Sequence, residues 1–563
     1  MVRYLLIFIF AINIMPAAAA DLPPPSFLAL CYHNVEDQDP DQTYEGVTTA
    51  RLVEHLSWLQ SNGYHFVSVD DLIAAKDGHK PLPDKAVLLT FDDGYVSFYT
   101  RVFPVLKAFH APAVLGLVGS WMGNGVNGEV SYGDETLSRK AFVTWDQVRE
   151  MFRSGLVEIA AHSNAQHHNI LANPQGNTEP AMVTRRFDPV TASYESGEAY
   201  EKRIKADTAA ISRIIAHEIG KRPRVMIWPY GETNDFAVSI ATADGMPITF
   251  TLQDGVATLD RIRASPRYLV EDNPSIGDFV GAIDKIPAVH TIRVVQVDLD
   301  TVYDPDPAQQ GRNLDALIER IYRLQINAVF LQAFSDPDKP GFAKQLYFPN
   351  RYLPMRADLF NHVSWQLRTR AKVQVFAWMP LLAFDFGDTD SDAQHRKILG
   401  LYEDLARAAP FDGLFFDDAP SSEEAAHLPD FIQALVAHVR HYRAPLMTAR
   451  TIASPINKEQ LDSFLKTYDY TVIQANGDEP WLRQMVKTIA ARPDGLQHTI
   501  FDLPTVDGQE GTIPTETIAG QMRFLARAGA LNFGYYPDDV AGNHPDASEL
   551  HKDFSLQSYP YLP

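Results

Sequence analysis

The sequence predicts an α/β protein with two tandem barrels, an incomplete (β/α)7-like barrel followed by a (β/α)8 barrel. Three observations support this prediction. The chain has 563 residues, which is long enough for two large domains. Short apolar runs alternate with helical segments, as in parallel sheets covered by helices. These runs form two series, and the eight units of the second extend over about 270 residues, the size of a (β/α)8 barrel.

The predicted strands of the first series are short and apolar throughout, as expected for strands that are buried on both faces. They comprise residues 27–31, 64–69, 86–91, 113–118, 157–160, 225–228 and 248–252. Leu52, Leu56 and Leu59 recur at helical spacing, and Gly63 ends this predicted helix. Residues 172–199 lack a clear period and predict a loop insertion. We assign residues 21–287 to the first domain.

The second series begins after Pro287. Its predicted strands comprise residues 292–297, 327–333, 372–379, 413–416, 444–449, 470–475, 498–501 and 530–536. Helical stretches such as 313–324 and 430–441 lie between them. We assign residues 288–563 to the second domain.

The composition excludes several classes of protein. Hydrophobic residues make up 45% of the chain and charged residues 21%, which is typical of globular proteins and not of disordered, collagenous or coiled-coil chains. Asp and Glu outnumber Lys and Arg by 71 to 49, so the net charge is −22. Because a phosphate backbone is bound through Lys and Arg, we expect no nucleic-acid partner.

The N-terminus predicts export. Arg3 precedes an apolar run over residues 4–15, and residues 17–20 are alanines. This run is short for a membrane span and fits a cleaved signal peptide of residues 1–20, so we expect a periplasmic protein. A buried N-terminal helix is the alternative. The only cysteine, Cys31, follows Leu-Ala-Leu as in a lipoprotein cleavage box, but it lies far beyond the apolar run and within a predicted strand. Lipidation, and with it association with the outer membrane, is therefore the less favoured reading.

Polar side chains follow two strands of the first series. The strand at 86–91 is followed by Asp92, Asp93 and Gly94, and two adjacent carboxylates repel each other unless a cation lies near them. The strand at 157–160 leads to His162, His167 and His168. Catalytic groups of α/β barrels lie at the carboxyl ends of strands, and imidazole with carboxylate is a ligand set for a hydrolytic divalent cation. A solvated turn and a surface loop are the alternatives.

These motifs carry a family resemblance. Thr90-Phe91-Asp92-Asp93-Gly94, with His162-Ser163 and His167, resembles the polysaccharide deacetylases of carbohydrate esterase family 4. The resemblance implies that Asp92 is the catalytic base and that Asp93, His162 and His167 bind one divalent metal ion; Zn, Ni, Co or Fe would suit these ligands. It also implies that Tyr230, in Trp228-Pro229-Tyr230-Gly231, supplies a backbone N–H to the oxyanion. The acid would be His33, which follows the first strand as in the circularly permuted branch.

The permuted order and the second barrel together resemble the poly-β-1,6-N-acetylglucosamine N-deacetylases of bacterial biofilm export. The densest match is residues 297–310, and further matches are residues 331–334, 347–351 and 534–539. The resemblance implies metal-dependent deacetylation of this exopolysaccharide, docking to an outer-membrane export porin, and a glycoside-hydrolase-like second barrel that binds the partly deacetylated polymer and cleaves it in some relatives. A chitin or peptidoglycan deacetylase and a non-catalytic polysaccharide escort are the alternatives.

Two departures from the family pattern stand out. His162 and His167 are five residues apart, whereas four is the commoner spacing in these esterases. Ile227 stands where the arginine that orients the base is expected. Arg224 and Arg267 are the two candidates to replace it, and the sequence does not decide between them.

The second barrel carries carboxylates just beyond its strands, where a glycosidase keeps its acid. Asp418 is the preferred acid and Asp417 the second choice, and a helix cap is the alternative. Aromatic and acidic side chains suit sugar rings and amines, which adds six candidate contacts: Asp298, Asp300, Tyr303, Trp378, Tyr536 and Asp538. The sequence offers no clear second carboxylate partner for the acid, so substrate-assisted chemistry is one route to cleavage.

Overall fold

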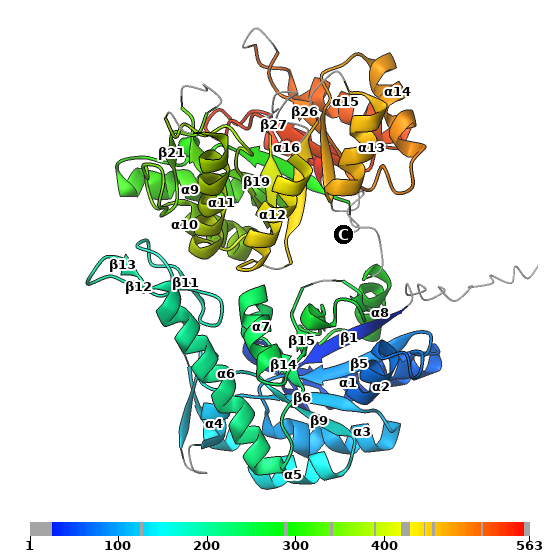
Figure 1. Ribbon diagram of the computed structural model, residues 1–563. Coiled ribbons are helices and arrows are strands. Elements are labelled where there is room, and N and C mark those ends of the chain that lie inside the picture. Colours follow the sequence, from blue (N-terminus) through cyan, green and yellow to red (C-terminus); the bar gives the residue numbers. More distant parts are fainter. Residues whose placement is uncertain are drawn as a thin grey trace, which may run out of the picture.

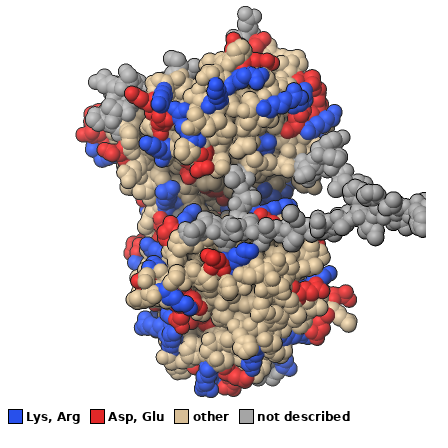
Figure 2. Space-filling view, turned by 90° about the vertical axis from the view of Figure 1, so that its right-hand side faces the viewer, with Lys and Arg blue, Asp and Glu red and all other residues tan. Residues whose placement is uncertain are grey.

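The computed structural model has two lobes (Figure 1), and the surface is hollowed between them (Figure 2). It describes residues 25–123, 128–133, 135–253, 255–286, 291–337, 342–387, 390–417, 428–443, 445–452, 456–507 and 511–556. The predicted signal peptide, the 287/288 boundary and Asp418 lie outside these residues. Within them, no helix is both long and apolar enough to cross a membrane.

The first lobe contains a nine-stranded sheet in the order β15-β14-β9-β6-β5-β1-β16, with β4 beside β5 and β17 beside β1. The strands are β1 (Ser26–Tyr32), β4 (His65–Phe66), β5 (Ala86–Phe91), β6 (Ala113–Leu117), β9 (Val157–Ala161), β14 (Val225–Ile227), β15 (Ile248–Phe250), β16 (Ala257–Thr258) and β17 (Tyr268–Leu269). All strands from β15 to β1 pair in parallel. The sheet does not close, so the first barrel is incomplete, as predicted.

Helices pack outside this sheet (Figure 1). They are α1 (Thr49–Ser61), α2 (Val69–Lys76), α3 (Phe103–Phe109), α4 (Gly119–Gly123), α5 (Trp145–Arg153), α6 (Gly197–Ile219), α7 (Asp235–Ala243) and α8 (Ile276–Lys285). The predicted strand at 64–69 is wrong in its second half, because Ser68 caps the N-terminus of α2. The two short strands β16 and β17 were not predicted, since two residues are too few to show a period.

The predicted loop insertion at 172–199 holds two hairpins and reaches the second lobe. The hairpins are β10 (Asn169–Leu171) with β11 (Thr178–Pro180), and β12 (Phe187–Asp188) with β13 (Ser193–Tyr194). Asn173 binds Asn361, and the Tyr194 hydroxyl donates to Asp358. Below them, Arg368 binds Glu232 at 2.9 Å, so the insertion and the first barrel both contact the second lobe.

The second lobe is a closed barrel of eight parallel strands, as predicted. The strands are β18 (Arg293–Val297), β19 (Ala328–Gln332), β22 (Gln374–Trp378), β23 (Gly413–Phe416), β24 (Met447–Thr451), β25 (Tyr470–Gln474), β26 (Thr499–Pro504) and β27 (Asn532–Tyr536). Around them lie α9 (Pro307–Leu324), α10 (Phe360–Gln366), α11 (Ser391–Ala408), α12 (Leu428–Arg440), α13 (Lys458–Thr467), α14 (Glu479–Ala490), α15 (Thr515–Ala528) and α16 (Ala547–Phe554).

Aromatic side chains fill the interior of this barrel. The Phe330 and Phe415 rings stack at 4.1 Å between centroids, and Phe376 packs edge-on against Phe330. Because side chains alternate in direction along a strand, residues two positions further along point into the barrel mouth. This places Gln332, Trp378 and Asp417 above the aromatic layer.

Candidate active site

Asp92 and Asp93 directly follow β5, and both are 2% exposed. The chain turns sharply there, because Asp93 and Gly94 both adopt left-handed backbone angles, with φ of 71° and 74°. A side chain at Gly94 would lie 2.7 Å from a Leu117 methyl carbon, which explains the glycine. The turn separates the two carboxylates, so that Asp93 faces the histidines and Asp92 faces Arg267.

Asp93, His162 and His167 form a compact cluster. The Asp93 Oδ1 atom lies 3.4 Å from Nε2 of His162 and 3.3 Å from Nε2 of His167. Within the described residues no donor binds this oxygen. Bond lengths of about 2.0–2.2 Å in tetrahedral geometry require ligand atoms about 3.3–3.5 Å apart, so the three residues fit one divalent cation. The neighbouring His168 is not part of the cluster.

Two further groups orient these ligands. The Nδ1 atom of His162 lies 2.9 Å from the Ile227 carbonyl, which can only accept, so Nδ1 carries the proton and Nε2 is left to bind a cation. The Tyr132 hydroxyl donates to Asp93 Oδ2 at 2.7 Å. Tyr132 lies on the hairpin β7 (Glu129–Tyr132) and β8 (Glu135–Ser138), and sequence analysis missed it because it belongs to no motif.

Electrostatics keep the cluster in a form that binds metal. Burial alone would raise the pKa of Asp93, but the nearby His167 and His162 outweigh it and hold that pKa well below its usual range. Burial lowers the pKa of His167 to about 4. At neutral pH the carboxyl group is therefore ionised and the imidazole neutral, which are the states required of metal ligands.

Arg267 takes the place of the expected orienting arginine. Its guanidinium binds both oxygens of Asp92, at 2.7 and 2.8 Å, and is fully buried just before β17. Burial raises the pKa of Asp92, but Arg267 outweighs it and lowers the pKa to about 2. The other candidate, Arg224, binds Glu158 and Asp70 instead.

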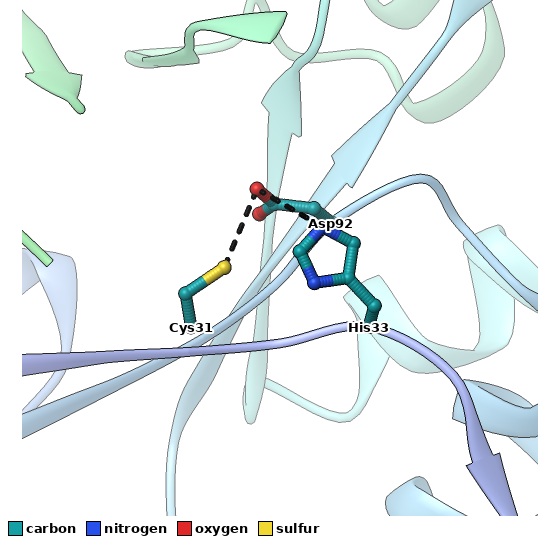
Figure 3. A group of neighbouring side chains, drawn as sticks. All are labelled: Cys31, His33 and Asp92. Atoms are coloured by element: carbon teal, nitrogen blue, oxygen red, sulfur yellow. Dashed lines mark hydrogen bonds and ion pairs between the residues drawn. The ribbon is translucent and has the colours of Figure 1, made fainter. Parts of the chain in front are cut away.

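His33 lies opposite Asp92, the predicted base. Its Nε2 atom is 4.0 Å from Asp92 Oδ2, and its Nδ1 atom pairs with Glu45 at 2.8 Å. Burial lowers the pKa of His33, but the sulfur of Cys31 and the Glu45 carboxylate outweigh it and raise the pKa well above its usual range. The Cys31 thiol points at the same oxygen of Asp92, at 3.5 Å (Figure 3). Neither Cys31 nor Glu45 was predicted as a site residue.

Tyr230 lies beside the cluster, as its motif predicts. The short helix Pro229–Gly231 follows β14, and Tyr230 is left-handed there, with φ of 58°. Its ring centroid lies 4.9 Å from that of His167. A side chain at Gly231 would lie 2.4 Å from the backbone nitrogen of Leu252, so only glycine lets this turn pack against the end of β15.

The mouth of the second barrel gathers several of the predicted contacts. The Tyr536 hydroxyl donates to Asp298 at 3.2 Å, and the Trp378 ring packs edge-on against Tyr536 at 5.7 Å. Thr451 donates to Asp417 at 2.5 Å. Gln332 is 3% exposed, points into the same mouth, and its Oε1 has no donor among the described residues.

Asp502 supplies the second carboxylate that sequence analysis did not find. It lies on β26 next to Gly534, where a side chain would come within 2.9 Å of its Oδ1. Burial raises the pKa of Asp502 well above its usual range, and the Asp417 carboxylate raises it further. Its position could have been found, because it directly follows the predicted strand at 498–501.

Three other candidates are engaged elsewhere. The Asp538 carboxylate is buried against Arg320 at 2.7 Å and accepts from Tyr535, so we remove it from the candidate contacts. Asp300 accepts hydrogen bonds from the hydroxyls of Ser335 and Tyr347, among others, and so links these two side chains. The guanidinium of Arg356 lies over the ring of Tyr303, with its Cζ atom 4.7 Å from the ring centroid.

Comparison with known proteins establishes the family. Residues 79–249 match the profile of the polysaccharide deacetylases, and residues 296–398 and 421–536 match hypothetical glycosyl hydrolase family 13. The chain is 37% identical to the poly-β-1,6-N-acetyl-D-glucosamine N-deacetylase of Escherichia coli strain K12, over 96% of this chain and 93% of that protein. The chain belongs to this family. The family resemblance and the two-domain fold inferred from the sequence are thereby confirmed.

Other members match parts of the chain. The poly-β-1,6-N-acetyl-D-glucosamine N-deacetylase of Staphylococcus epidermidis is 26% identical over 44% of this chain and 80% of its own length. A de-N-acetylase structure from Aggregatibacter actinomycetemcomitans is 38% identical over 46% of this chain and 99% of its own, with a TM-score of 0.43. The PgaB (BpsB) glycoside hydrolase domain from Bordetella bronchiseptica is 37% identical over 48% of this chain and 100% of its own, with a TM-score of 0.44.

Proposed function

We propose that this protein removes N-acetyl groups from poly-β-1,6-N-acetyl-D-glucosamine in a metal-dependent hydrolysis. The observation that carries this proposal is the arrangement of three groups at one end of the first sheet. A cluster that fits one divalent cation lies beside an ionised carboxylate, Asp92, and an imidazole, His33, faces that carboxylate. Relatives that bear the name of this activity match both lobes.

The base side of the reaction rests on Asp92. When bound, the divalent cation supplies a Lewis acid that polarises the amide carbonyl and makes water more acidic. Asp92 stays ionised because Arg267 holds both of its oxygens, and it accepts the proton of the attacking water. Arg267 also fixes the direction of the carboxylate, so little reorganisation is needed at the moment of reaction.

The acid side of the reaction rests on His33. The raised pKa favours the protonated imidazole, so Nε2 can donate a proton to the leaving amine. The backbone N–H of Tyr230, on the strained turn after β14, donates to the oxyanion. The products are acetate and a glucosamine unit, which becomes cationic once its amine is protonated.

The setting of this reaction follows from the same family. We infer that the metal is Zn, Ni, Co or Fe, all of which accept imidazole and carboxylate ligands. The apolar N-terminal run supports export to the periplasm. There the protein would process the polymer of a biofilm matrix, and docking to an outer-membrane export porin stays a prediction.

The second barrel has the groups needed to bind the product and to cleave it. A ring of acidic and aromatic side chains suits a polymer that carries amines. The Asp417–Asp502 pair favours hydrolysis as a second activity, because a neighbouring carboxylate and burial both raise the pKa of Asp502. The raised pKa favours the protonated form of Asp502, so we assign it as the acid.

Acetate release from oligomers of defined linkage tests the deacetylase. We expect release from a β-1,6-linked N-acetylglucosamine pentamer, its loss with a chelator, and its return on adding a divalent metal. The β-1,4-linked pentamer is the matched control and should release much less. Equal or faster release from the β-1,4 oligomer would favour the chitin or peptidoglycan alternative, and no release with any metal would favour a polysaccharide escort.

Cleavage of the partly deacetylated polymer tests the second barrel. We expect shorter products by mass spectrometry from the wild type, and a rate at least about 100-fold lower in Asp502→Asn and in Asp417→Asn, since each loses a proton-transfer group. Asp92→Asn is the control and should cleave a previously deacetylated polymer at the normal rate. A polymer of unchanged length with wild-type protein would leave this barrel as a binding module.

A further inference from the structure

Cys31 lies beside the proposed catalytic base, and the proposed reaction gives its thiol no direct step. It is the only cysteine of the chain and is fully buried at the end of β1. Cys31 and His33 are two residues apart on an extended segment, so their side chains leave the chain on the same face. Asp92 reaches them from β5, which pairs with β1 in parallel.

The three side chains converge on one point (Figure 3). A sulfur, an imidazole nitrogen and a carboxylate oxygen all lie within 4.8 Å of one another. Cys31 Sγ is 3.5 Å and His33 Nε2 is 4.0 Å from Asp92 Oδ2. Zinc bonds of about 2.0–2.3 Å in tetrahedral geometry need these atoms about 3.3–3.7 Å apart, so the sulfur–oxygen distance already fits, and the imidazole must move closer to complete the site.

The surroundings of the cluster also suit a metal. The Glu45 carboxylate pairs with Nδ1 of His33 at 2.8 Å, which leaves Nε2 as the ligand atom, as in carboxylate–histidine–zinc arrangements. Arg267 donates to Asp92 from the other side, at 2.8 Å from Oδ2 itself, and so fixes the position of that oxygen. A thiolate, an imidazole and a carboxylate together prefer zinc or cadmium to magnesium or calcium.

The charges balance when a divalent cation enters. When Cys31 is counted as a thiol and His33 as an imidazolium, their charges, that of Arg267 and those of the Asp92 and Glu45 carboxylates sum to zero. A divalent cation would displace one proton from the Cys31 sulfur and one from His33 Nε2, and both protons would go to solvent. Two positive charges enter and two protons leave, so the buried net charge stays at zero.

We propose that Cys31, His33 and Asp92 form a second, inhibitory site for a thiophilic divalent cation such as Zn²⁺. This site is distinct from the Asp93–His162–His167 cluster. It captures both the base and the acid assigned above, so the cation stops deacetylation when it exceeds what the first site binds. The inhibition rests on the proposed function, whereas the binding of the cation does not.

Cadmium titration of the metal-stripped full chain, loaded with one equivalent of zinc, tests the proposal. Because the chain has a single cysteine, a sulfur-to-cadmium charge-transfer band in the ultraviolet reports Cys31 alone. We expect the band to saturate at about one further equivalent, with acetate release falling at least about tenfold in step. Cys31→Ser should show no band, and its acetate release, whatever its level before the titration, should not fall as cadmium is added. Cys31→Ala repeats this test without a hydroxyl. Excess Mg²⁺ should neither produce the band nor lower acetate release by the wild type.

Two outcomes would overturn the proposal, and a third variant separates the sites. The absence of a band in a large excess of cadmium would mean that Cys31 is a buried apolar filler. A saturated band with undiminished acetate release would mean that the cation leaves the base and the acid free. Asp93→Asn should lose the first metal and the activity but keep the band. If the proposed deacetylation is itself wrong, the sample that holds one equivalent of zinc and no cadmium will release no acetate, so this failure is distinguished from failure of the second site.

Discussion

In the first lobe, Asp92 and His33 each have a partner of opposite charge, whereas in the second lobe the Asp502 carboxyl group lies near another carboxylate, Asp417. Arg267 holds Asp92 and Glu45 holds His33. In the second barrel, the charged group that acts on Asp502 is Asp417. The difference indicates two tasks. Fixed protonation states suit hydrolysis of a neutral amide, and a surplus of negative charge suits a polymer that has become cationic.

The largest expected effect separates the two lobes. Asp93→Ala removes the carboxylate of the metal cluster, so we expect loss of one metal equivalent and a fall in acetate release of at least about 1000-fold. Metal analysis and an acetate assay measure these changes. The binding of glucosamine oligomers to the second barrel should not change. Weaker binding of those oligomers would contradict the separation of tasks.

Arg267→Met should have the next largest effect, since it leaves the Asp92 carboxylate buried without its partner. Breaking a buried ion pair costs about 3–5 kcal/mol of stability, measurable by urea denaturation. In the wild type, Arg267 lowers the pKa of Asp92 from its ordinary 3.8 to about 2. The pair therefore stabilises the fold above the ordinary pKa, and this stabilisation is lost as pH falls through about 2.

The same substitution should also move the pH–rate profile. Without Arg267, burial raises the pKa of Asp92, so the acid limb of the profile should shift to higher pH. The matched control is Arg224→Met, because Arg224 pairs with Glu158 and a largely exposed Asp70. A profile that moves equally in both variants would remove Arg267 from its assigned role.

Tyr132→Phe tests the outer contact to the metal cluster. It removes the hydrogen bond to Asp93 Oδ2 and keeps the ring, so we expect a 10–100-fold loss of metal affinity, measured by competition with a chromophoric chelator. Tyr99→Phe is the control, because Tyr99 donates to Glu150 at the surface. Unchanged affinity in Tyr132→Phe would show that the hairpin does not support the site.

The smallest expected effect lies at the mouth of the second barrel. Asp298→Asn removes one negative charge of several, so we expect glucosamine oligomers to bind about twofold to fivefold more weakly, and the difference to shrink at high salt. Titration calorimetry at two salt concentrations measures this. Fully N-acetylated oligomers carry no amine and should bind equally to both proteins; a loss there would point to packing instead of charge.

The sequence was most informative where long apolar runs set the strands. Those runs located all eight strands of the second barrel and the parallel core of the first, and the motifs placed Asp92, Asp93, His162 and His167 in one site. The structure groups His167, and not His168, with Asp93 and His162. These residues lie directly after, or within a few residues of, buried strands, so locating the ends of the strands also locates the site.

Groups that reach the site from irregular segments could not be predicted in this way. Arg267 precedes a strand of two residues, Tyr132 lies on an edge hairpin, and Glu45 ends a short turn. Their contacts to the site are long-range in the sequence, and no periodicity marks them. Asp502 differs, because it directly follows the predicted strand at 498–501. It was missed because that strand was predicted to end too early, whereas β26 continues to Pro504.

Acetate release from a β-1,6-linked N-acetylglucosamine pentamer by wild type and Asp92→Asn, with metal content measured on both, tests the central claim most directly. We predict chelator-sensitive release by the wild type, and a variant that keeps its metal, bound through Asp93 and the two histidines, but has lost turnover. Full turnover in Asp92→Asn with the metal still bound would contradict the assignment of Asp92 as the base, and with it the chemistry proposed for the first barrel.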